Sequence, residues 1–321
     1  MKKRASIVDY YYESMYPELQ VLEQDRLVIV SKLKKAAFFL FCLAIATYFF
    51  LRYQFHFISL EALALSFMGA FMLFMFVYRH ESAGYSMLFK DHVIEKIIHF
   101  LDASLAYYKH RYLLEDAYQK SELFLEQYDR YSGSDLIEGV IEGVSVQFCD
   151  LHVEKKYRTK NGKEEWKDIF SGLFFVADFN KNFQTNVVVL PDHAERMLGV
   201  LGSWLQSINQ SRGELIKLDD SLFESYFVVY GNDPIESRYI LTHSLMEKIV
   251  QLRQKSGKNL YLSFVDSKIY IAIEYNKALF EPILWKSLLK FSYIKEYVEL
   301  LSMMIGIVKH FKLDEKLWSK R

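Results

Sequence analysis

The chain has 321 residues, and its 40 Lys and Arg residues are balanced by 40 Asp and Glu, so its formal charge is zero. This balance argues against a nucleic-acid-binding protein that relies on a chain-wide basic surface. The two cysteines, Cys42 and Cys149, cannot build a disulfide framework, and no CxxC spacing for zinc is present. The composition favours a reducing compartment.

Two apolar runs dominate the N-terminal third of the chain. Ala36–Leu51 (AAFFLFCLAIATYFFL) and Ala62–Tyr78 (ALALSFMGAFMLFMFVY) contain no charged residue. One crossing of the bilayer core needs about 20 helical residues, so each run needs its flanks to span it. The pattern predicts a transmembrane hairpin over residues 36–78, with a short turn near Arg52 and Glu61. A pair of buried helices in a soluble protein is the alternative.

The basic residues predict how this hairpin is oriented. Seven Lys and Arg residues precede the first run, Arg52 alone lies in the turn, and Arg79, Lys90 and Lys96 follow the second run. The positive-inside rule then places both termini in the cytoplasm and the turn outside.

Residues 1–35 are expected to form a cytoplasmic amphipathic helix. Apolar residues recur at spacings of three and four over 7–35, with Arg26 in the stripe. Because Pro17 is tolerated only near a helix start, the regular helix is expected to begin near Tyr16. We expect the stripe to pack on the post-membrane helix, on a partner or on a second copy of the chain, which predicts a homo-oligomer. Its expected contact residues are Leu19, Leu22, Ile29 and Leu33.

A helical stalk is expected over residues 79–131, with a helix from Ser86 to Asp102 that carries the chain out of the bilayer. Six tyrosines follow between residues 107 and 131. They are expected to cover the junction between the stalk and the next domain.

Residues 132–321 are expected to form a cytoplasmic α+β domain. Alternating polarity over 135–179 predicts an antiparallel meander of about three strands, with the hairpin turn at Asn161-Gly162. A short strand is expected at Val187–Leu190, and a second hairpin joins 259–265 to 268–274.

Helices are expected among these strands. One would be capped by Asp192, and another would run over 242–255, from the N-cap candidate Thr242 to a stop at Gly257. Two more are expected over 278–289 and 292–311. Residues 223–231 are compatible with either a helix or a strand.

The candidate site lies in the stretch CDLHVEKK, where a strand would place Asp150, His152 and Glu154 on one face. These residues could serve acid–base catalysis or bind a metal, or they could be the solvated face of an ordinary strand. Alternate side chains stand roughly 7 Å apart, so a metal site needs further ligands. The metal ligands we expect are His152, His193 and Asp178. No cofactor is expected, because the chain has no P-loop, GxGxxG, HExxH or GxSxG motif.

The chain also carries a series of blocks in a fixed order: YDRYSGSDLIEG, FCDLHVEKK, IFSGLFFVADFNK, VVVLPD, GELIKLDD, YFVVYGNDPIESRYILT, LYLSFVDSKIYIAI and LFEP. These blocks resemble a bacterial family known as domain-of-unknown-function family 3137, over about Phe89–Trp318. The resemblance implies a protein tethered to the bacterial inner (cytoplasmic) membrane, with no established activity or catalytic residues. Genes of such proteins often neighbour those of LemA-family membrane proteins, so it also implies a LemA-family partner.

Three functions remain open from the sequence. The missing catalytic motifs and the apolar-striped flanking helices favour a membrane-anchored interaction or scaffold protein that self-associates. One alternative is a membrane-bound metal-dependent or acid–base enzyme that uses Asp150, His152 and Glu154. The other is a small-ligand sensor with its pocket between the meander and the second hairpin.

Overall fold

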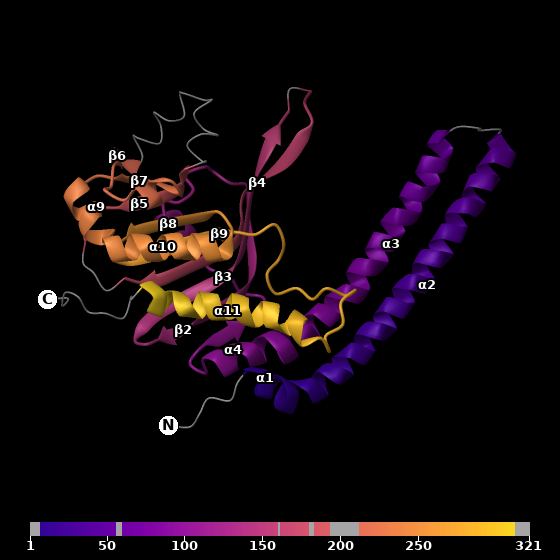
Figure 1. The fold of residues 1–321 in the computed structure, drawn as a ribbon. Helices are drawn as coiled ribbons and strands as arrows, with labels where there is room; N and C mark the ends of the chain where they lie inside the picture. The colour runs from indigo at the N-terminus through magenta and orange to yellow at the C-terminus, as the bar shows by residue number, and fades with distance from the viewer. Residues whose placement is uncertain (1–6, 56–59, 160, 180–182, 193–211, 312–321) are drawn as a thin grey trace. The chain divides into compact units, whose positions relative to one another are not determined.

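The computed structural model describes residues 7–55, 60–159, 161–179, 183–192 and 212–311 (Figure 1). The chain divides into two compact units. The first comprises Met1–Ile97 and Phe280–Leu300, and the second comprises Ile98–Leu279 and Leu301–Arg321. The first unit is helical and the second is built around a sheet, which confirms the α+β prediction.

Two long antiparallel helices that lie side by side dominate the first unit (Figure 1). They are α2 (Tyr16–Phe55) and α3 (Leu60–Phe89). The rings of Phe41 and Phe67 meet at 5.8 Å, and Lys32 Nζ lies 3.1 Å from Glu81 Oε2. The two predicted apolar runs are therefore paired, inside helices that extend well beyond them. Short helical segments flank them along the chain: α1 (Ile7–Tyr10), η1 (Tyr11–Met15), η2 (Lys90–Ile94) and α4 (Glu95–Leu101), of which α4 extends into the second unit.

A π-helical turn precedes Pro17. Proline lacks a backbone N–H and crowds the preceding turn of an α-helix. The wider turn η1 ends at Met15, and α2 begins at Tyr16, which confirms the predicted start of the regular helix. The wider turn accommodates Pro17, whose missing N–H would interrupt the hydrogen bonding of a regular α-helix.

Within the described ranges, one helix is long and apolar enough to cross a membrane by length and composition. It runs over Leu63–Leu101, and none of its apolar window is buried inside the structure. The helix that contains the first predicted span, Ala36–Leu51, does not meet this criterion of length and composition. The two-pass topology therefore remains a prediction.

A buried ion pair on α2 holds the segment that follows the sheet. Arg26 Nη2 lies 2.7 Å from Glu23 Oε1, and Arg26 Nη1 donates to the carbonyl of Leu284 at 2.6 Å. The backbone N–H of Leu288 donates to Glu23 Oε2 at 3.0 Å. Burial alone would raise the pKa of Glu23, but the hydrogen bonds from Arg26 and Leu288 outweigh it and hold the pKa below its usual value.

Residues 275–290 contain turns and irregular backbone rather than the helix predicted over 278–289. That prediction was wrong. The apolar spacing is helical, but the backbone groups of Leu284, Leu288 and Ile283 bind Arg26, Glu23 and the Tyr293 hydroxyl. Tertiary partners have replaced the helical hydrogen bonds. The helix predicted over 292–311 is present as α11 (Phe291–Phe311).

Over its described residues, the second unit contains a nine-stranded sheet in the order β1-β2-β3-β4-β9-β8-β5-β7-β6, with every pairing antiparallel. The strands are β1 (Ala106–Tyr108), β2 (Arg130–Ile141), β3 (Val144–Arg158), β4 (Glu164–Asp178), β5 (Val187–Pro191), β6 (Glu214–Ile216), β7 (Phe227–Gly231), β8 (Leu260–Val265) and β9 (Lys268–Glu274). The predicted meander, short strand and second hairpin are confirmed. Residues 223–231 divide between a helix and a strand, α8 (Ser221–Glu224) and β7.

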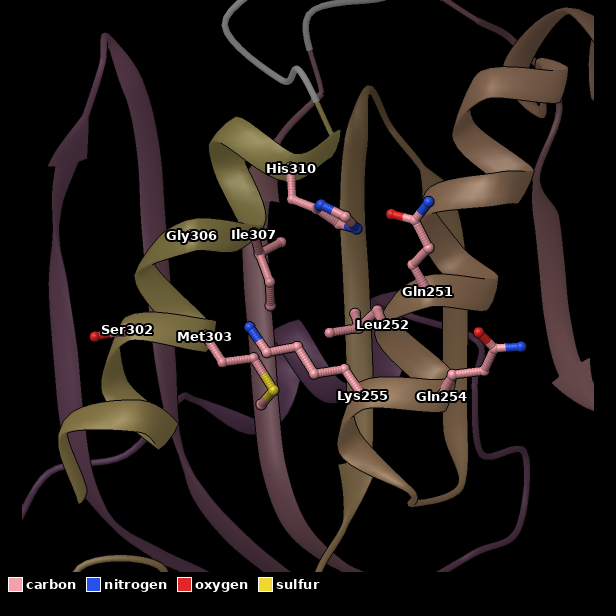
Figure 2. A pocket seen from close by; sticks show the side chains of 9 residues that line it. All are labelled: Gln251, Leu252, Gln254, Lys255, Ser302, Met303, Gly306, Ile307 and His310. Atoms are coloured by element: carbon pink, nitrogen blue, oxygen red, sulfur yellow. The ribbon is translucent and has the colours of Figure 1, made fainter. Parts of the chain in front are cut away.

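Both faces of the central strands are covered. On β9, Tyr270 and Ala272 belong to one buried cluster, while Ile269, Ile271 and Ile273 on the other face are also fully buried. The first cluster includes Tyr118 from α5 (Glu115–Lys120). Over the opposite face lies α10 (His243–Ser256), beside the last turns of α11 (Figure 2). The short helix α9 (Pro234–Ile240) precedes α10.

The predicted ends of α10 are confirmed. The Thr242 side chain accepts a hydrogen bond from the N–H of Leu245, and Gly257 closes the helix with φ +62°. The helix predicted after Asp192 lies outside the described residues.

Candidate functional site

The candidate site lies on β3 and β4, within the halves of these strands that are nearer the hairpin turn joining them. The turn at Asn161-Gly162 is confirmed, with Gly162 at φ +76°. Thr159 donates its N–H to the carbonyl of Lys163 at 2.8 Å. Three residues thus lie between the hydrogen-bonded Thr159 and Lys163, and this register places Glu154 opposite Asp168.

A β-bulge sets which residues of β4 face the site. Val153 pairs with Phe170 and Glu154 pairs with Asp168, so Ile169 is an extra residue on β4. Ile169 and Phe170 both pack against the buried cluster. The bulge thereby keeps two consecutive apolar residues on the core side and turns Asp168 to the side of His152.

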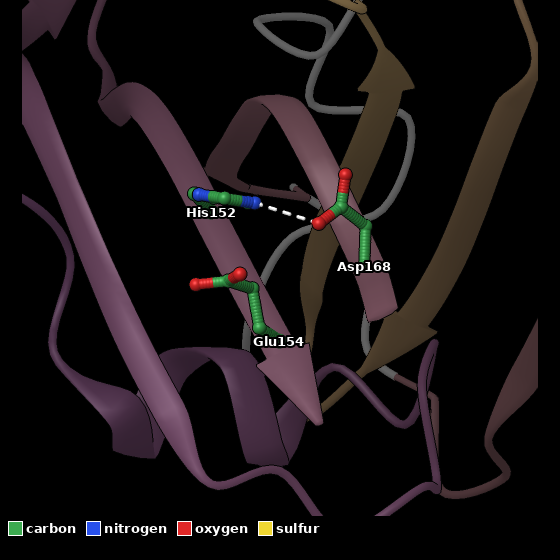
Figure 3. Close-up of side chains that lie close together, drawn as sticks. All are labelled: His152, Glu154 and Asp168. Carbon is green, nitrogen blue, oxygen red and sulfur yellow. Dashed lines mark hydrogen bonds and ion pairs between the residues drawn. The ribbon is translucent and has the colours of Figure 1, made fainter. Parts of the chain in front are cut away.

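The structure brings His152, Glu154 and Asp168 together (Figure 3). His152 Nε2 lies 2.9 Å from Asp168 Oδ1, and one ligand atom from each of the three residues lies within 4.8 Å of the others. Glu154 is buried, His152 is half-buried and the Asp168 side chain is 62% exposed. Within the described ranges, no other group of three such residues lies this close.

Arg130 on β2 balances part of the charge at this site. Its Nη1 lies 2.8 Å from Glu154 Oε2, and its guanidinium carbon lies 3.9 Å from the centre of the Trp166 ring. A guanidinium held over an indole in this way gains cation–π stabilisation. Arg130, Glu154 and Asp168 together carry a net charge of −1 at neutral pH.

Asp150 has a different role from that of His152. Its Oδ2 accepts the backbone N–H of Leu279 at 3.0 Å, so the carboxylate fixes the chain just after β9. Asp150 lies on the same face of β3 as His152 and Glu154. This hydrogen bond, however, joins its carboxylate to the loop that follows β9.

The expected metal ligand Asp178 does not approach His152. His152 pairs with Ser171, and Asp178 lies seven residues farther along β4, or about 23 Å at the rise of a strand. His193 lies outside the described residues. The acid that joins His152 is instead Asp168, which sequence reasoning missed.

The sequence does contain a signal for Asp168. Glu154 and Asp168 are both seven residues from Asn161. A two-residue Asn-Gly turn would, however, place Ile169 opposite Glu154. Asp168 lies opposite Glu154 because three residues separate Thr159 from Lys163 and because Ile169 is bulged. The sequence does not distinguish this arrangement from the two-residue turn.

The expected interaction residues lie in the first unit. Leu19, Leu22 and Leu33 are buried by the chain itself, and Ile29 is half-buried. The stripe is thus part of the core of this unit rather than a free surface.

A separate groove lies between α10 and α11 in the second unit (Figure 2). It has a volume of about 590 Å³ and is lined by residues that include Lys255, Met303 and Gly306. His310 at its rim interacts through Nε2 with the carbonyl of Lys248 at 3.0 Å, so this nitrogen is the donor. The meander and second hairpin, between which the sequence places a ligand pocket, are instead neighbours in one continuous sheet through β4 and β9.

Residues 168–313 match the family model described as Protein of unknown function (DUF3137). This match confirms the resemblance over β4 to α11, while the bacterial origin and the membrane tether that it implies remain predictions. Of the three site residues, Asp168 lies inside the matched range and His152 and Glu154 precede it. Comparisons with curated proteins and with solved structures found no match.

Proposed function

We propose that this chain is a membrane-anchored interaction protein, which holds its sheet-containing unit at a bacterial inner membrane through the α2–α3 hairpin. The observation that carries the proposal is the outward surface of this hairpin. Within the predicted spans, the side chains that face away from the partner helix are almost all apolar. The most exposed large apolar side chains are Phe38, Phe39 and Phe50 on α2, and Phe71, Met72 and Phe76 on α3.

An apolar surface of this extent is unusual on a soluble protein. Phe38 and Phe76 are 72% and 71% exposed, and Phe50 and Phe71 are each 63% exposed. Large contiguous apolar patches mark sites that meet another protein or a membrane. The uncharged runs of 16 and 17 residues are about 24 and 26 Å long as helices, slightly less than the 30 Å core of a bilayer. Residues that flank the runs complete the crossing.

The proposed partners are a second copy of this chain and a LemA-family membrane protein. Because Leu19, Leu22 and Leu33 are buried, a test of self-association must use exposed apolar residues of α2. Val21 and Val28 are exposed and seven residues apart, so they lie on one side of the helix. Changing both to Ser should reduce the oligomer size in detergent without unfolding the protein. If the oligomer size does not change, this side of α2 is not the contact between copies of the chain.

Single-cysteine labelling tests the membrane arrangement. Each variant carries one new cysteine in a Cys42→Ser background, at Gln24, Tyr53 or Arg79, all of which are exposed. A two-pass hairpin with cytoplasmic termini predicts that a charged maleimide labels Tyr53→Cys in intact cells. Gln24→Cys and Arg79→Cys should react only after permeabilisation.

The same variants distinguish the alternatives. If α3 alone crosses the membrane, Gln24→Cys and Tyr53→Cys react on one side and Arg79→Cys on the other. If neither helix crosses, all three react on the same side, and the proposed anchor is wrong. Cys149 supplies an internal control because it is fully buried and should stay unlabelled throughout.

A further inference from the structure

We propose that His152, Glu154 and Asp168 form a binding site for a divalent transition-metal ion of the Zn²⁺ type. The site is independent of the membrane anchor and could operate in either arrangement of the hairpin.

The spacing of the donor atoms supports this assignment. Two ligands held at about 2.1 Å by one ion stand about 3.4 Å apart at the tetrahedral angle of Zn²⁺ sites and about 3.0 Å apart at the right angle of octahedral sites. His152 Nε2 and Asp168 Oδ1 stand 2.9 Å apart as a hydrogen-bonded pair, so a change of about 0.5 Å or less brings them to either separation. The Glu154 ligand atom lies within 4.8 Å of both, so the Glu154 side chain must turn toward them to place its oxygen at bonding distance from the same ion.

Each ligand has a donor atom to offer. Glu154 uses Oε2 to bind Arg130, which leaves Oε1 for an ion. To bind a metal, His152 must present the lone pair of Nε2 and carry its proton on Nδ1. The ion then replaces the hydrogen bond between His152 and Asp168. The backbone of β3 and β4 can stay in place.

The donor types select the class of metal. One imidazole nitrogen with two carboxylates suits Zn²⁺, Mn²⁺, Fe²⁺ or Co²⁺ better than Mg²⁺ or Ca²⁺, which prefer all-oxygen sites. Three protein ligands leave at least one coordination position for water, as in zinc sites that perform chemistry. The net charge of −1 from Arg130, Glu154 and Asp168 attracts a cation.

The metal titration uses the full-length protein in detergent. Co²⁺ added to apo-protein should give d–d absorption bands that saturate at one equivalent and disappear when Zn²⁺ is added. His152→Ala should weaken Co²⁺ binding at least tenfold. The matched control is His243→Ala, because His243 Nδ1 also faces an acid, Asp220 Oδ2, at 3.2 Å, but no third ligand joins them within the described part of the chain. This control should bind Co²⁺ as the unmodified protein does.

Trp166 supplies a local readout, because its ring stacks on Arg130, which binds Glu154. A paramagnetic ion at the site should quench the emission of Trp166. This part of the quenching should be absent in Trp166→Phe. Asp168→Asn provides a second variant that should leave folding unchanged, since its side chain is exposed. It should reduce both Co²⁺ affinity and quenching.

The proposal is overturned if Co²⁺ binding is equal in His152→Ala, Asp168→Asn and the unmodified protein. It is also overturned if quenching persists in Trp166→Phe, because the ion is then bound elsewhere. Unchanged melting temperatures in the variants would show that loss of binding is not loss of fold.

Discussion

Two neighbouring tyrosines in the core of the second unit differ in one hydrogen bond. The rings of Tyr118 and Tyr131 meet at 5.6 Å. The Tyr131 hydroxyl donates to the carbonyl of Leu113 at 2.9 Å, whereas the buried Tyr118 hydroxyl has no partner among the described residues. An unpaired buried hydroxyl costs about 1–3 kcal/mol. The tyrosines of this segment therefore fill a core, and one of them does so at an energetic loss.

Replacing these two tyrosines by phenylalanine should have opposite effects. Tyr118→Phe removes the unpaired hydroxyl and should raise the free energy of unfolding by about 1 kcal/mol. Tyr131→Phe leaves the Leu113 carbonyl without its donor and should lower it by about 1 kcal/mol. Urea unfolding of the detergent-solubilised protein measures both. A loss of stability in Tyr118→Phe would show that its hydroxyl has a partner in solution.

Cys149 should be inert on the opposite face of the strand that carries His152. Burial raises the pKa of this thiol to about 12, against a smaller opposing effect of a hydrogen bond with the Leu113 backbone. At pH 9 only about one thiol in 1,000 is then ionised, and the thiolate is the reactive form. In a Cys42→Ser background, native protein should resist iodoacetamide at pH 9, while urea-unfolded protein reacts fully.

The same shift predicts how stability changes in alkali. The unfolded thiol ionises near pH 8.5 and the folded one near 12, so deprotonation favours the unfolded state between these values. The contribution of Cys149 is complete below about pH 8.5 and falls by up to about 1.4 kcal/mol per pH unit above it. Cys149→Ala should flatten this part of the stability curve, measured by urea unfolding from pH 8 to 10. An equally steep fall in the variant would assign the loss to the tyrosines.

At the scale of elements, two glycines of the sheet test how tightly the strands are packed. Gly172 on β4 has φ +147°, and a Cβ there would overlap the carbonyl oxygen of Ile273 on β9. Gly143 in the β2–β3 turn has φ +83° but open space around it. Gly172→Ala should lower the free energy of unfolding by more than about 3 kcal/mol, because the β4–β9 ladder must shift. Gly143→Ala should lower it by only about 1 kcal/mol.

These two values are compared by thermal or urea unfolding of the same preparation. Equal losses would mean that β4 and β9 separate easily at Gly172. A loss confined to Gly143→Ala would contradict the register of this strand pair.

Local signals in the sequence were enough for most elements. Thr242 and Gly257 mark the ends of α10, and Asn161-Gly162 marks the hairpin, because caps and turns depend on nearby residues. The site was only half predicted. His152 and Glu154 share a strand face by simple alternation, but the arrival of Asp168 depends on a bulge whose cause is the packing of Ile169 and Phe170 against distant residues.

The helix wrongly predicted over 278–289 failed for a related reason. Its apolar residues are spaced as in a helix, yet its backbone groups are bound by Glu23 and Arg26, more than 250 residues earlier. No local pattern reports such partners. Tertiary hydrogen bonds overrode the local preference of the segment.

At the scale of the whole molecule, the apolar hairpin surface should tolerate no charge. Phe71 lies near the middle of the second uncharged run and is exposed. Phe71→Lys should disfavour insertion by about 2.5–3.5 kcal/mol, because a lysine near the centre of a bilayer is poorly solvated. The fraction of protein that stays in the membrane pellet after alkaline carbonate extraction should fall. Gln24→Lys, on the exposed side of α2 outside the runs, is the control and should not change it.

The buried pair Glu23–Arg26 has a consequence for the biosynthesis of this protein. Its partners Leu284 and Leu288 are 258 and 265 residues away from Arg26 and Glu23. At a synthesis rate of 5–20 residues per second, the ribosome needs roughly 13–50 s to make the intervening chain. During that time the helices of the first unit exist without the segment that covers them. A membrane that receives the hairpin early, or a chaperone that shields the stripe of Leu19 and Leu22, would protect the nascent chain until Leu284 and Leu288 emerge.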